Sequence, residues 1–376
     1  MDLELSEDEA ALRNNVRSVL GGICPASVPR AVFEGGDCPP ELWQTMVDLG
    51  WPALAIAEAH GGLGLGFVEL VIVAEELGRA VAPGPFLATT TQYASALAEL
   101  GGAVSSELLG AVAAGARTGT LAVAEAGSWS LEGIATTALS SGSGWSLTGS
   151  KCAVVDGDRA DEVLVVARAE GGLGAFVVPR SQVVTSRRVT VDPTVPLVDL
   201  QLEQVHVPDE RVVAAPGPAG VEVALARALQ RATVASAAMT VGACRRIFEV
   251  TVDYAKAREQ YGRPIGSFQA LKHRMVDMLI SVERATALVY LAALTIAEDD
   301  EDRAIATAAA KAAAGDCQRL LVEEGLQLHG GIGFTWEHDL HLLLKRAKTG
   351  DSLFGGGVAQ RAHLAQLIGA APGGIS

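Results

Sequence analysis

The hydrophobic pattern changes its period twice along the 376-residue chain, and this constrains the fold more than any single motif. Residues 1–116 carry apolar side chains at helical spacing, and residues 221–376 do so again. Between them, residues 117–213 hold short apolar runs of strand length, separated by Gly, Asp and Ser. The sequence therefore predicts a helical domain at 1–116, a β domain at 117–213 and a second helical domain at 221–376.

Local signals place several boundaries inside this plan. Ser6 precedes Glu7 and Asp8, which is typical of a capped helix start with acids at its positive end. "PPELWQTMVDLG" (39–50) and "FVELVIVAEELGRA" (67–80) have apolar residues at helical spacing and end near a Gly. After the Pro/Gly-rich hinge "AAPGPAG", breaks at "YGRPIGS", "AEDDEDR" and "HGGIGFTWEHD" predict three or four long helices.

Composition excludes some classes of function. The net charge of −15 argues against broad binding to nucleic acid or anionic membranes, which requires a basic surface. The five cysteines lie far apart, so neither a zinc motif nor a disulfide framework is expected. The N-terminus is acidic and amphipathic, and no apolar run is long enough to span a bilayer. We expect a cytoplasmic protein with no membrane span.

One candidate ligand-binding segment is "AREQYGRPIGSFQALKHRMVDM", residues 257–278. Arg258 precedes a turn that contains Gly262 and Pro264, and a helix begins shortly afterwards. Arginine is a permanent cation with several donors, a combination that suits a pyrophosphate. Gln269 lies near the start of the new helix and offers an amide. A lone Arg at a helix end is usually a surface charge, so the interpretation depends on a second segment.

The second segment is "QLHGGIGFTWEHDLHLLLKRAK", residues 327–348. Gln327, Gly330, Gly331 and Gly333 form a bend between two predicted helices. Glycines let a flat ligand approach the backbone closely. The two segments together favour a ligand that carries both a phosphate and a planar group.

These segments, together with "AHGGLGLGFVELVIVAEELGR" (59–79), resemble the acyl-CoA dehydrogenase family over essentially the whole chain. The resemblance implies a mainly α fold with a central β domain: an N-terminal helical domain, a small β-barrel or sandwich, and a C-terminal four-helix bundle. It also implies FAD as cofactor, with its isoalloxazine ring in a neighbouring subunit, and therefore at least a dimer. By the same resemblance, the pyrophosphate and adenosine end of FAD is held by Arg258, Gln269, Gln327, Gly330 and Gly331.

Other motifs invite simpler interpretations. "GGLGLG" (61–66) precedes a predicted helix but follows no clear strand, so a dinucleotide fingerprint is not expected there. His273 and His329 are expected to serve packing or hydrogen bonding. His338 and His341 would share one helical face, but no third ligand for a metal is apparent.

The reaction implied by the resemblance removes two hydrogens from an acyl-CoA thioester. A carboxylate takes the α proton, and the β hydrogen leaves as hydride to the flavin. In the family, this carboxylate occupies one of a few alignment positions. Here those positions hold Ala232, Phe354 and Gly356, none of which accepts a proton. The Arg that usually neighbours the first of them is Thr233, while Arg227 and Arg231 are out of register.

Two other acids are candidate bases. Asp351 would lie three residues before Phe354 on a helix and could face the same side, although a surface or capping role is the favoured explanation. Glu125 in "LAVAEAGS" matches a strand of the family and ranks below Asp351, with a structural role or a place near the flavin edge expected. The segment Lys151–Val155 also departs from the family, because "KCAVV" replaces "K-x-W-I-[ST]", which lines the flavin.

This combination favours the subunit without the base in a heteromeric acyl-CoA dehydrogenase, a heterotetramer with two copies of each subunit. A homologous partner would supply the carboxylate, an electron-transfer flavoprotein would accept electrons, and the acyl group would be fatty, branched or a sterol side chain. Two alternatives stay open. One is a self-sufficient homomeric dehydrogenase that uses Asp351, and the other is a non-redox acyl-CoA-binding or scaffold protein.

Overall fold

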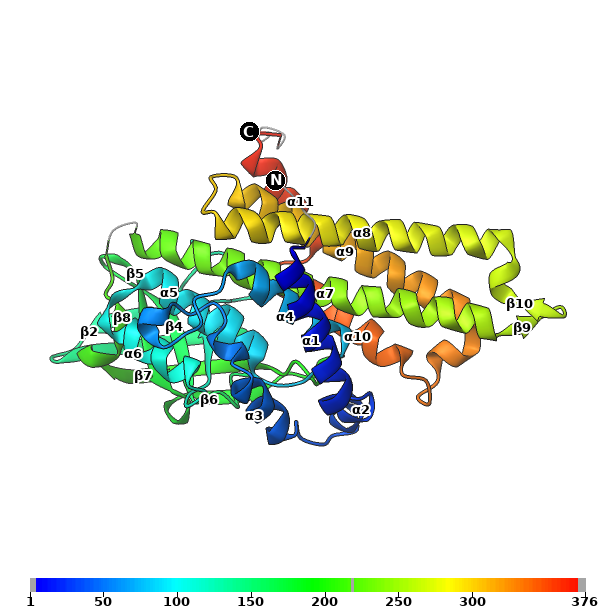
Figure 1. The fold of residues 1–376 in the computed structure, drawn as a ribbon. Coiled ribbons are helices and arrows are strands. Elements are labelled where there is room, and N and C mark those ends of the chain that lie inside the picture. The colour runs from blue at the N-terminus through cyan, green and yellow to red at the C-terminus, as the bar shows by residue number, and fades with distance from the viewer. Residues whose placement is uncertain (1–4, 218–219, 371–376) are drawn as a thin grey trace. The chain divides into compact units, whose positions relative to one another are not determined.

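The computed structural model describes residues 5–217 and 220–370, and it confirms the predicted order of helices, sheet and helices (Figure 1). The residues cluster into two compact units. The first unit contains Met1–Cys38, Phe67–Pro83 and Thr233–Ser376, and the second contains Pro39–Gly66 and Gly84–Ala232. Both units draw on separate stretches of sequence, and the division into three contiguous domains stays a prediction.

Two N-terminal helices of the first unit begin where the sequence signals predict. Helix α1 (Glu7–Ile23) has Ser6 as its cap, with the Ser6 hydroxyl accepting from the Glu9 backbone at 3.3 Å and the Glu9 carboxylate accepting from the Ser6 backbone at 2.7 Å. Helix α2 (Ser27–Phe33) follows, and α4 (Phe67–Arg79) is buried along most of its length. No strand precedes α4 directly, in agreement with the interpretation of residues 61–66.

The C-terminal helices of the first unit are α8 (Gln269–Ala297), α9 (Arg303–His329), α10 (Leu340–Ser352) and α11 (Gly357–Leu367), with α7 (Gly220–Ala257) shared between the units. Glycine allows α4 and α7 to touch. A Cβ added at Gly78 would lie 2.0 Å from the Met239 carbonyl oxygen, and one at Gly242 would lie 1.9 Å from the Glu75 carbonyl oxygen. The breaks between the long helices fall within the three predicted segments.

Helix α8 is the one helix in the described part of the chain with the length and apolar composition of a membrane-crossing helix. Half of its most apolar window is buried inside the protein, a property that core helices share. Its remaining surface includes the exposed apolar side chains Val276, Leu279 and Ile280.

The second unit combines a sheet with short helices. The helices are α3 (Pro40–Asp48), η1 (Trp51–Ala53), η2 (Glu58–His60), the π-helix η3 (Leu87–Ala94), α5 (Ser95–Leu100), α6 (Gly102–Ala113), η4 (Arg180–Gln182) and η5 (Asp209–Arg211). The strands are β1 (Gly119–Ala122), β2 (Thr137–Ser140), β3 (Gly144–Val155), β4 (Glu162–Ala169), β5 (Gly172–Pro179), β6 (Val184–Arg187), β7 (Leu197–Pro208) and β8 (Val212–Ala214). They form one mixed sheet in the order β6-β7-β3-β2-β4-β5-β8, and β1 pairs in parallel with β4.

Alternation along β4 separates two hydrophobic cores. Leu164 and Val166 face a cluster that includes residues of η3, α5 and α6. Val163 and Val165 face a second cluster built with β3, β5 and β7. Because neighbouring side chains of a strand point to opposite faces, this period of two fixes which residues meet the helices.

Candidate functional site

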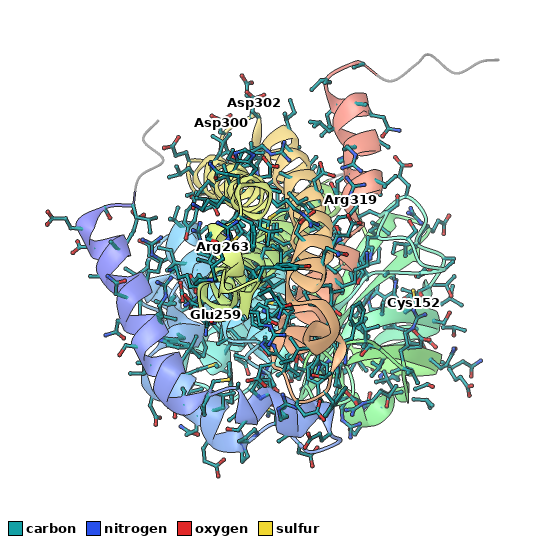
Figure 2. The ribbon with its side chains drawn as sticks, turned by 90° about the vertical axis from the view of Figure 1, so that its right-hand side faces the viewer. Cys152, Glu259, Arg263, Asp300, Asp302 and Arg319 are labelled. Carbon is teal, nitrogen blue, oxygen red and sulfur yellow. The ribbon has the colours of Figure 1, made fainter. Side chains whose placement is uncertain are left out.

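The first predicted cofactor segment lies where α7 ends. Arg258 is the residue after α7, and its backbone N–H donates to the Tyr254 carbonyl at 2.8 Å. The hairpin β9 (Glu259–Gln260) and β10 (Arg263–Pro264) follows, then η6 (Ile265–Ser267), and α8 begins at Gln269. The backbone N–H of Ile265 donates to the Arg258 carbonyl at 2.8 Å, which closes the segment on itself. Figure 2 looks onto this end of the bundle, with Glu259 and Arg263 of the hairpin labelled.

The second predicted segment is the turn that ends α9. Gly330 has φ of 63°, a left-handed conformation that favours glycine, and its N–H donates to the Leu326 carbonyl. The short helix η7 (Gly330–Phe334) follows. A Cβ at Gly330 or Gly331 would meet no heavy atom within 4 Å, so the backbone of this turn is open on its outer side. Gln327, one turn earlier on α9, is also exposed.

The structure brings these segments to one end of the helical bundle (Figure 1). The Tyr254 ring of α7 stacks on the His329 ring of α9, with 4.4 Å between centroids. An ion pair of 2.5 Å between Arg274 and Glu324 joins α8 to α9. Burial lowers the pKa of His329, whose Nδ1 lies 2.8 Å from the Gly325 carbonyl oxygen. His329 is therefore a neutral packing residue beneath the glycine turn, as the sequence indicates.

Sequence reasoning missed Tyr261. This residue and Gly262 form the two-residue loop of the hairpin, both with positive φ (54° and 75°), as a tight hairpin turn requires. Tyr261 is consequently 91% exposed. Its ring lies edge-on to Phe268, with 6.2 Å between the ring centroids. The guanidinium carbon of Arg263 lies 4.2 Å from the centroid of the same Phe268 ring. The sequence signal that could have identified Tyr261 is its place directly before the turn glycine Gly262, where a side chain is expected to be exposed. An exposed aromatic ring can stack on a flat ligand.

The positions at which the family carries its base are enclosed by protein or lack a side chain. Ala232 is 0% exposed within α7, and Phe354 is 4% exposed with φ of 57°. Helix α10 ends at Ser352, so Phe354 does not share a helix with Asp351. The expectation that the two face one side of a helix is wrong, because the chain leaves helical geometry before the glycines at 355–357.

Asp351 is engaged inside the bundle. Its Oδ1 accepts from the Gly357 backbone N–H at 3.1 Å, and its Oδ2 accepts from Gln318 Nε2 at 3.3 Å. Gly357 is the first residue of α11, so Asp351 satisfies a backbone donor at a helix start. This geometry explains the residue without catalysis, and its role as a base stays a prediction.

A buried lysine holds the end of α10. Lys311 of α9 is fully buried, and its Nζ donates to Ser236 Oγ at 3.2 Å and to the Gly350 carbonyl oxygen. Burial lowers the pKa of Lys311 to about 7, partly offset by the charge of Asp351. The segment before Phe354 is therefore fixed by contacts with α7 and α9.

The second unit offers no free carboxylate at Glu125. Its Oε1 pairs with Lys151 Nζ at 2.6 Å, and its Oε2 accepts from the Ala135 N–H at 2.7 Å. Burial raises the pKa of Glu125, but hydrogen bonds from Lys151, Thr136 and Ala135 outweigh it, so the net shift is downward. Burial lowers the pKa of Lys151 to about 8, with Glu125 opposing that shift. Glu125 is thus a structural anion, as ranked from the sequence.

The neighbouring family positions differ as the sequence indicates. Ala153 stands where the family has an aromatic residue, adopts φ of 52°, and donates its N–H to Asp199 Oδ1 at 3.2 Å. Cys152 accepts from the Gly127 N–H at 3.3 Å. The out-of-register arginines, Arg227 and Arg231, both pair with Glu99, at 2.7 and 2.9 Å.

FAD is the cofactor that the resemblance implies, and the bundle end fits its diphosphate and adenosine part. An exposed permanent cation, two exposed amides and an open glycine backbone are donors suited to phosphate oxygens. The exposed ring of Tyr261 offers a stacking surface beside them. His338 lies before α10 while His341 lies on it, so the expectation that the two share one helical face is wrong. Among residues 5–217 and 220–370, no group of three or more side chains is placed to hold a metal ion.

Comparison with known proteins agrees with this assignment. Residues 6–127 match the family model "Acyl-CoA dehydrogenase, N-terminal domain", and residues 219–368 match "Acyl-CoA dehydrogenase, C-terminal domain". The chain is 36% identical over 343 residues to acyl-CoA dehydrogenase IpdE2 of Mycobacterium tuberculosis, covering 91% of each protein.

Two solved structures extend the likeness to the fold. A chain of the Tcur3481–Tcur3483 steroid ACAD variant matches with a TM-score of 0.87 and 32% identity, over 96% of this chain and 98% of that one. A chain of the ChsE4–ChsE5 complex from Mycobacterium tuberculosis matches with a TM-score of 0.89 and 28% identity, over 99% and 100% of the two chains. The protein therefore belongs to the acyl-CoA dehydrogenase family, FAD-dependent oxidoreductases that act on CH–CH bonds.

Proposed function

We propose that this chain is the subunit without the catalytic base in a heteromeric acyl-CoA dehydrogenase. The observation that carries the proposal is the contrast between two parts of one bundle. The bundle end presents Arg258, Gln269 and the glycine turn to solvent, whereas the base positions hold buried Phe354 and Ala232. A chain with this pattern can contribute to cofactor binding, but it needs a carboxylate from elsewhere.

In this proposal the steps of the reaction are divided among FAD, this chain and the partner subunit. Bound FAD supplies the acceptor for the β hydrogen of the acyl thioester, which leaves as a hydride. In this chain, Arg258 would bind a phosphate oxygen through its guanidinium, while Gln269 and Gln327 would donate amide hydrogens. The backbone at Gly330 and Gly331 would approach the diphosphate closely. The α proton requires a general base, and the homologous partner subunit supplies that carboxylate.

An exposed stripe on α8 supports a protein partner. Val276, Leu279 and Ile280 are 51%, 38% and 60% exposed and lie one helical turn apart or adjacent. Apolar side chains grouped on one helix face mark protein–protein contacts more often than isolated ones do. The two similar structures above are each named for two proteins, and we propose that this chain likewise assembles with a related acyl-CoA dehydrogenase subunit.

The substrate class follows by analogy with one of those neighbours. The Tcur3481–Tcur3483 structure is described as a steroid ACAD, and we propose an acyl-CoA with a steroid-derived acyl group for this protein. We propose that the reaction takes place in the cytoplasm and that an electron-transfer flavoprotein accepts the electrons from the reduced flavin. A straight-chain fatty acyl-CoA serves as the comparison substrate.

A self-sufficient homomeric dehydrogenase is the second candidate, and Asp351 is the residue that would favour it. The carboxylate is close in sequence to the base position and is only partly exposed. Its two hydrogen bonds, however, connect it to the start of α11 and to α9. A base must reach a substrate proton, but both carboxylate oxygens of Asp351 already accept hydrogen bonds from donors within the protein.

The deciding experiment is a visible absorption spectrum followed by anaerobic addition of acyl-CoA. We expect the chain expressed alone to show no flavin bleaching with steroid-derived or fatty acyl-CoA. Co-expression with its homologous partner should give a yellow complex whose flavin band bleaches. Bleaching by the chain alone would instead establish the self-sufficient enzyme. Thioester binding by the colourless chain without a partner would establish the scaffold alternative.

A further inference from the structure

A cavity of about 560 Å³ lies within the first unit, and none of the residues assigned to the cofactor or the base lines it. It is lined by α1, α2, the C-terminal half of α4, one face of α7 and residues 337–343. Its volume is in the range typical of small-molecule sites. The lining contains two chemically different groups of side chains, and their difference indicates what the cavity can hold.

One side carries a chain of alternating charges. Arg17 pairs with Glu76 through two hydrogen bonds, of 2.9 and 2.6 Å, and Glu76 lies 3.8 Å from Arg79. Arg79 pairs in turn with Glu249 at 2.6 Å, and Arg246 contacts the same Glu249 oxygen at 3.2 Å. Three arginines thus share two carboxylates, and a cation stands at each end. These five side chains together carry one positive charge in excess.

The other charged groups at the cavity do not cancel this excess at the arginine side. Asp339 is paired with Arg30 at 2.5 Å. Glu337 is exposed and stands on the segment 337–343, which carries none of the three arginines. A negatively charged group would therefore be repelled from residues 337–339 and attracted to the arginines.

Most of the remaining lining is apolar. Leu20, Val81 and Leu340 are buried side chains from three different elements. Burial raises the pKa of the Cys24 thiol to about 11, so Cys24 is a neutral part of the same wall. Val81 holds φ of 52°, which is unusual for a β-branched residue, and its N–H donates to the Gly78 carbonyl at 3.1 Å.

From this combination of arginines and apolar side chains we propose that the cavity is a binding site for a small amphipathic carboxylate. The carboxylate binds at Arg79 and Arg246, and the apolar body lies against Leu20, Val81 and Leu340. A neutral alcohol of the same length leaves the excess arginine charge unmatched. An ammonium amphiphile meets that charge with repulsion. The proposal does not depend on the dehydrogenase role, because none of these residues belongs to it.

Calorimetric titration of the purified protein, in the assembly in which it is isolated, tests the ligand class. The probes are octanoate, 1-octanol and acetate. Octanoate carries both an apolar chain and a carboxylate, 1-octanol carries the apolar chain without the charge, and acetate carries the carboxylate without the long chain. Octanoate should bind saturably and about tenfold more tightly than either of the others, as expected for a hydrogen-bonded charge added to apolar burial. Equal affinity for 1-octanol and octanoate would overturn the anionic class.

Two glycines of α1 give a matched test of location. A Cβ added at Gly21 or at Gly22 would meet no heavy atom within 4 Å, so both positions accept a larger side chain on the helix surface. Only Gly21 lines the cavity. Gly21→Phe should weaken octanoate binding at least about tenfold by occupying the space, whereas Gly22→Phe should bind as the wild type does.

Arg246→Met completes the test by removing a cation while retaining a side chain of similar length. Octanoate affinity should fall about tenfold, and the affinity for 1-octanol should not change. Octanoate binding that survives Gly21→Phe unchanged, or no saturable binding by the wild type, would overturn the proposal.

Discussion

Two regions of the same helical bundle differ in whether their polar side chains have hydrogen-bond partners within the protein. At the end formed by the hairpin and the glycine turn, the side chains of Arg258 and Gln269 have no protein partner among the described residues. Near the C-terminal end of α10, Asp351 of α10 and Lys311 of α9 direct their polar atoms to protein partners. Unsatisfied exposed donors indicate a place for a ligand, while satisfied buried groups indicate a structural segment.

The sharpest way to break this comparison is to restore an acid where the family carries one. Phe354→Glu should lower the free energy of unfolding by roughly 3–5 kcal/mol, because a buried aromatic side chain is lost and a carboxylate is buried without a partner. Urea denaturation measures the change. Phe334→Glu is the matched control, since Phe334 is 76% exposed and should change stability by about 0.5 kcal/mol or less.

A stably folded Phe354→Glu protein that bleached with acyl-CoA on its own would contradict this expectation. It would show that the loop had lost only the carboxylate and had kept the geometry for proton transfer.

The opposite region is tested by Arg258→Met in the co-expressed complex. FAD affinity should fall about 10- to 100-fold, because a charge-assisted hydrogen bond contributes about 1.5–3 kcal/mol. Flavin fluorescence on dilution reports the released cofactor. Lys256→Met removes a cation two residues earlier, from a side chain that is 73% exposed, and should leave FAD affinity unchanged. Equal affinity in both variants would remove Arg258 from the cofactor site.

Lys311 gives a pH-dependent test of the buried region. Its pKa is lowered to about 7 from an ordinary value of 10.5, so between these values the unfolded chain binds more protons than the native one. Stability contributed by Lys311 should therefore increase as pH rises through this window. The wild type should gain stability relative to Lys311→Met in urea titrations from pH 7 to 10. Lys348→Met, at an exposed lysine on α10, should show no such gain. Parallel curves for wild type and Lys311→Met would refute the burial argument.

The smallest effect is expected for Asp351→Asn. The amide oxygen can still accept from the Gly357 N–H, so stability should change by about 1 kcal/mol or less. Turnover of the complex should stay within about twofold of the wild type, since Asp351 is not the base in this proposal. Steady-state rates of both proteins make the comparison. A collapse of turnover with unchanged stability would transfer the base to Asp351 and favour the self-sufficient enzyme.

Some strands and contacts could not be predicted from the sequence. The sequence predicts the β segment only as a whole, and the four-residue strands β2 and β6 are largely exposed and lack an alternating pattern that would mark them. The sequence predicted Asp351 and Phe354 on one face of a single helix, but α10 ends at Ser352, before Phe354. The exposure of Tyr261 depends on the pairing of β9 with β10, which its local sequence does not indicate.

The sequence by itself determined the helix–sheet–helix order, the Ser6 cap, the breaks between the long helices and, through the family resemblance, the absence of an acid at the base positions. These features depend on residues within a few positions of one another, where periodicity and capping act directly. The tertiary structure decided that Lys311 reaches Gly350, that Glu125 pairs with Lys151, and that a charged and an apolar wall enclose one cavity. Such contacts join residues 26 or more positions apart, and only the packing of whole elements brings them together.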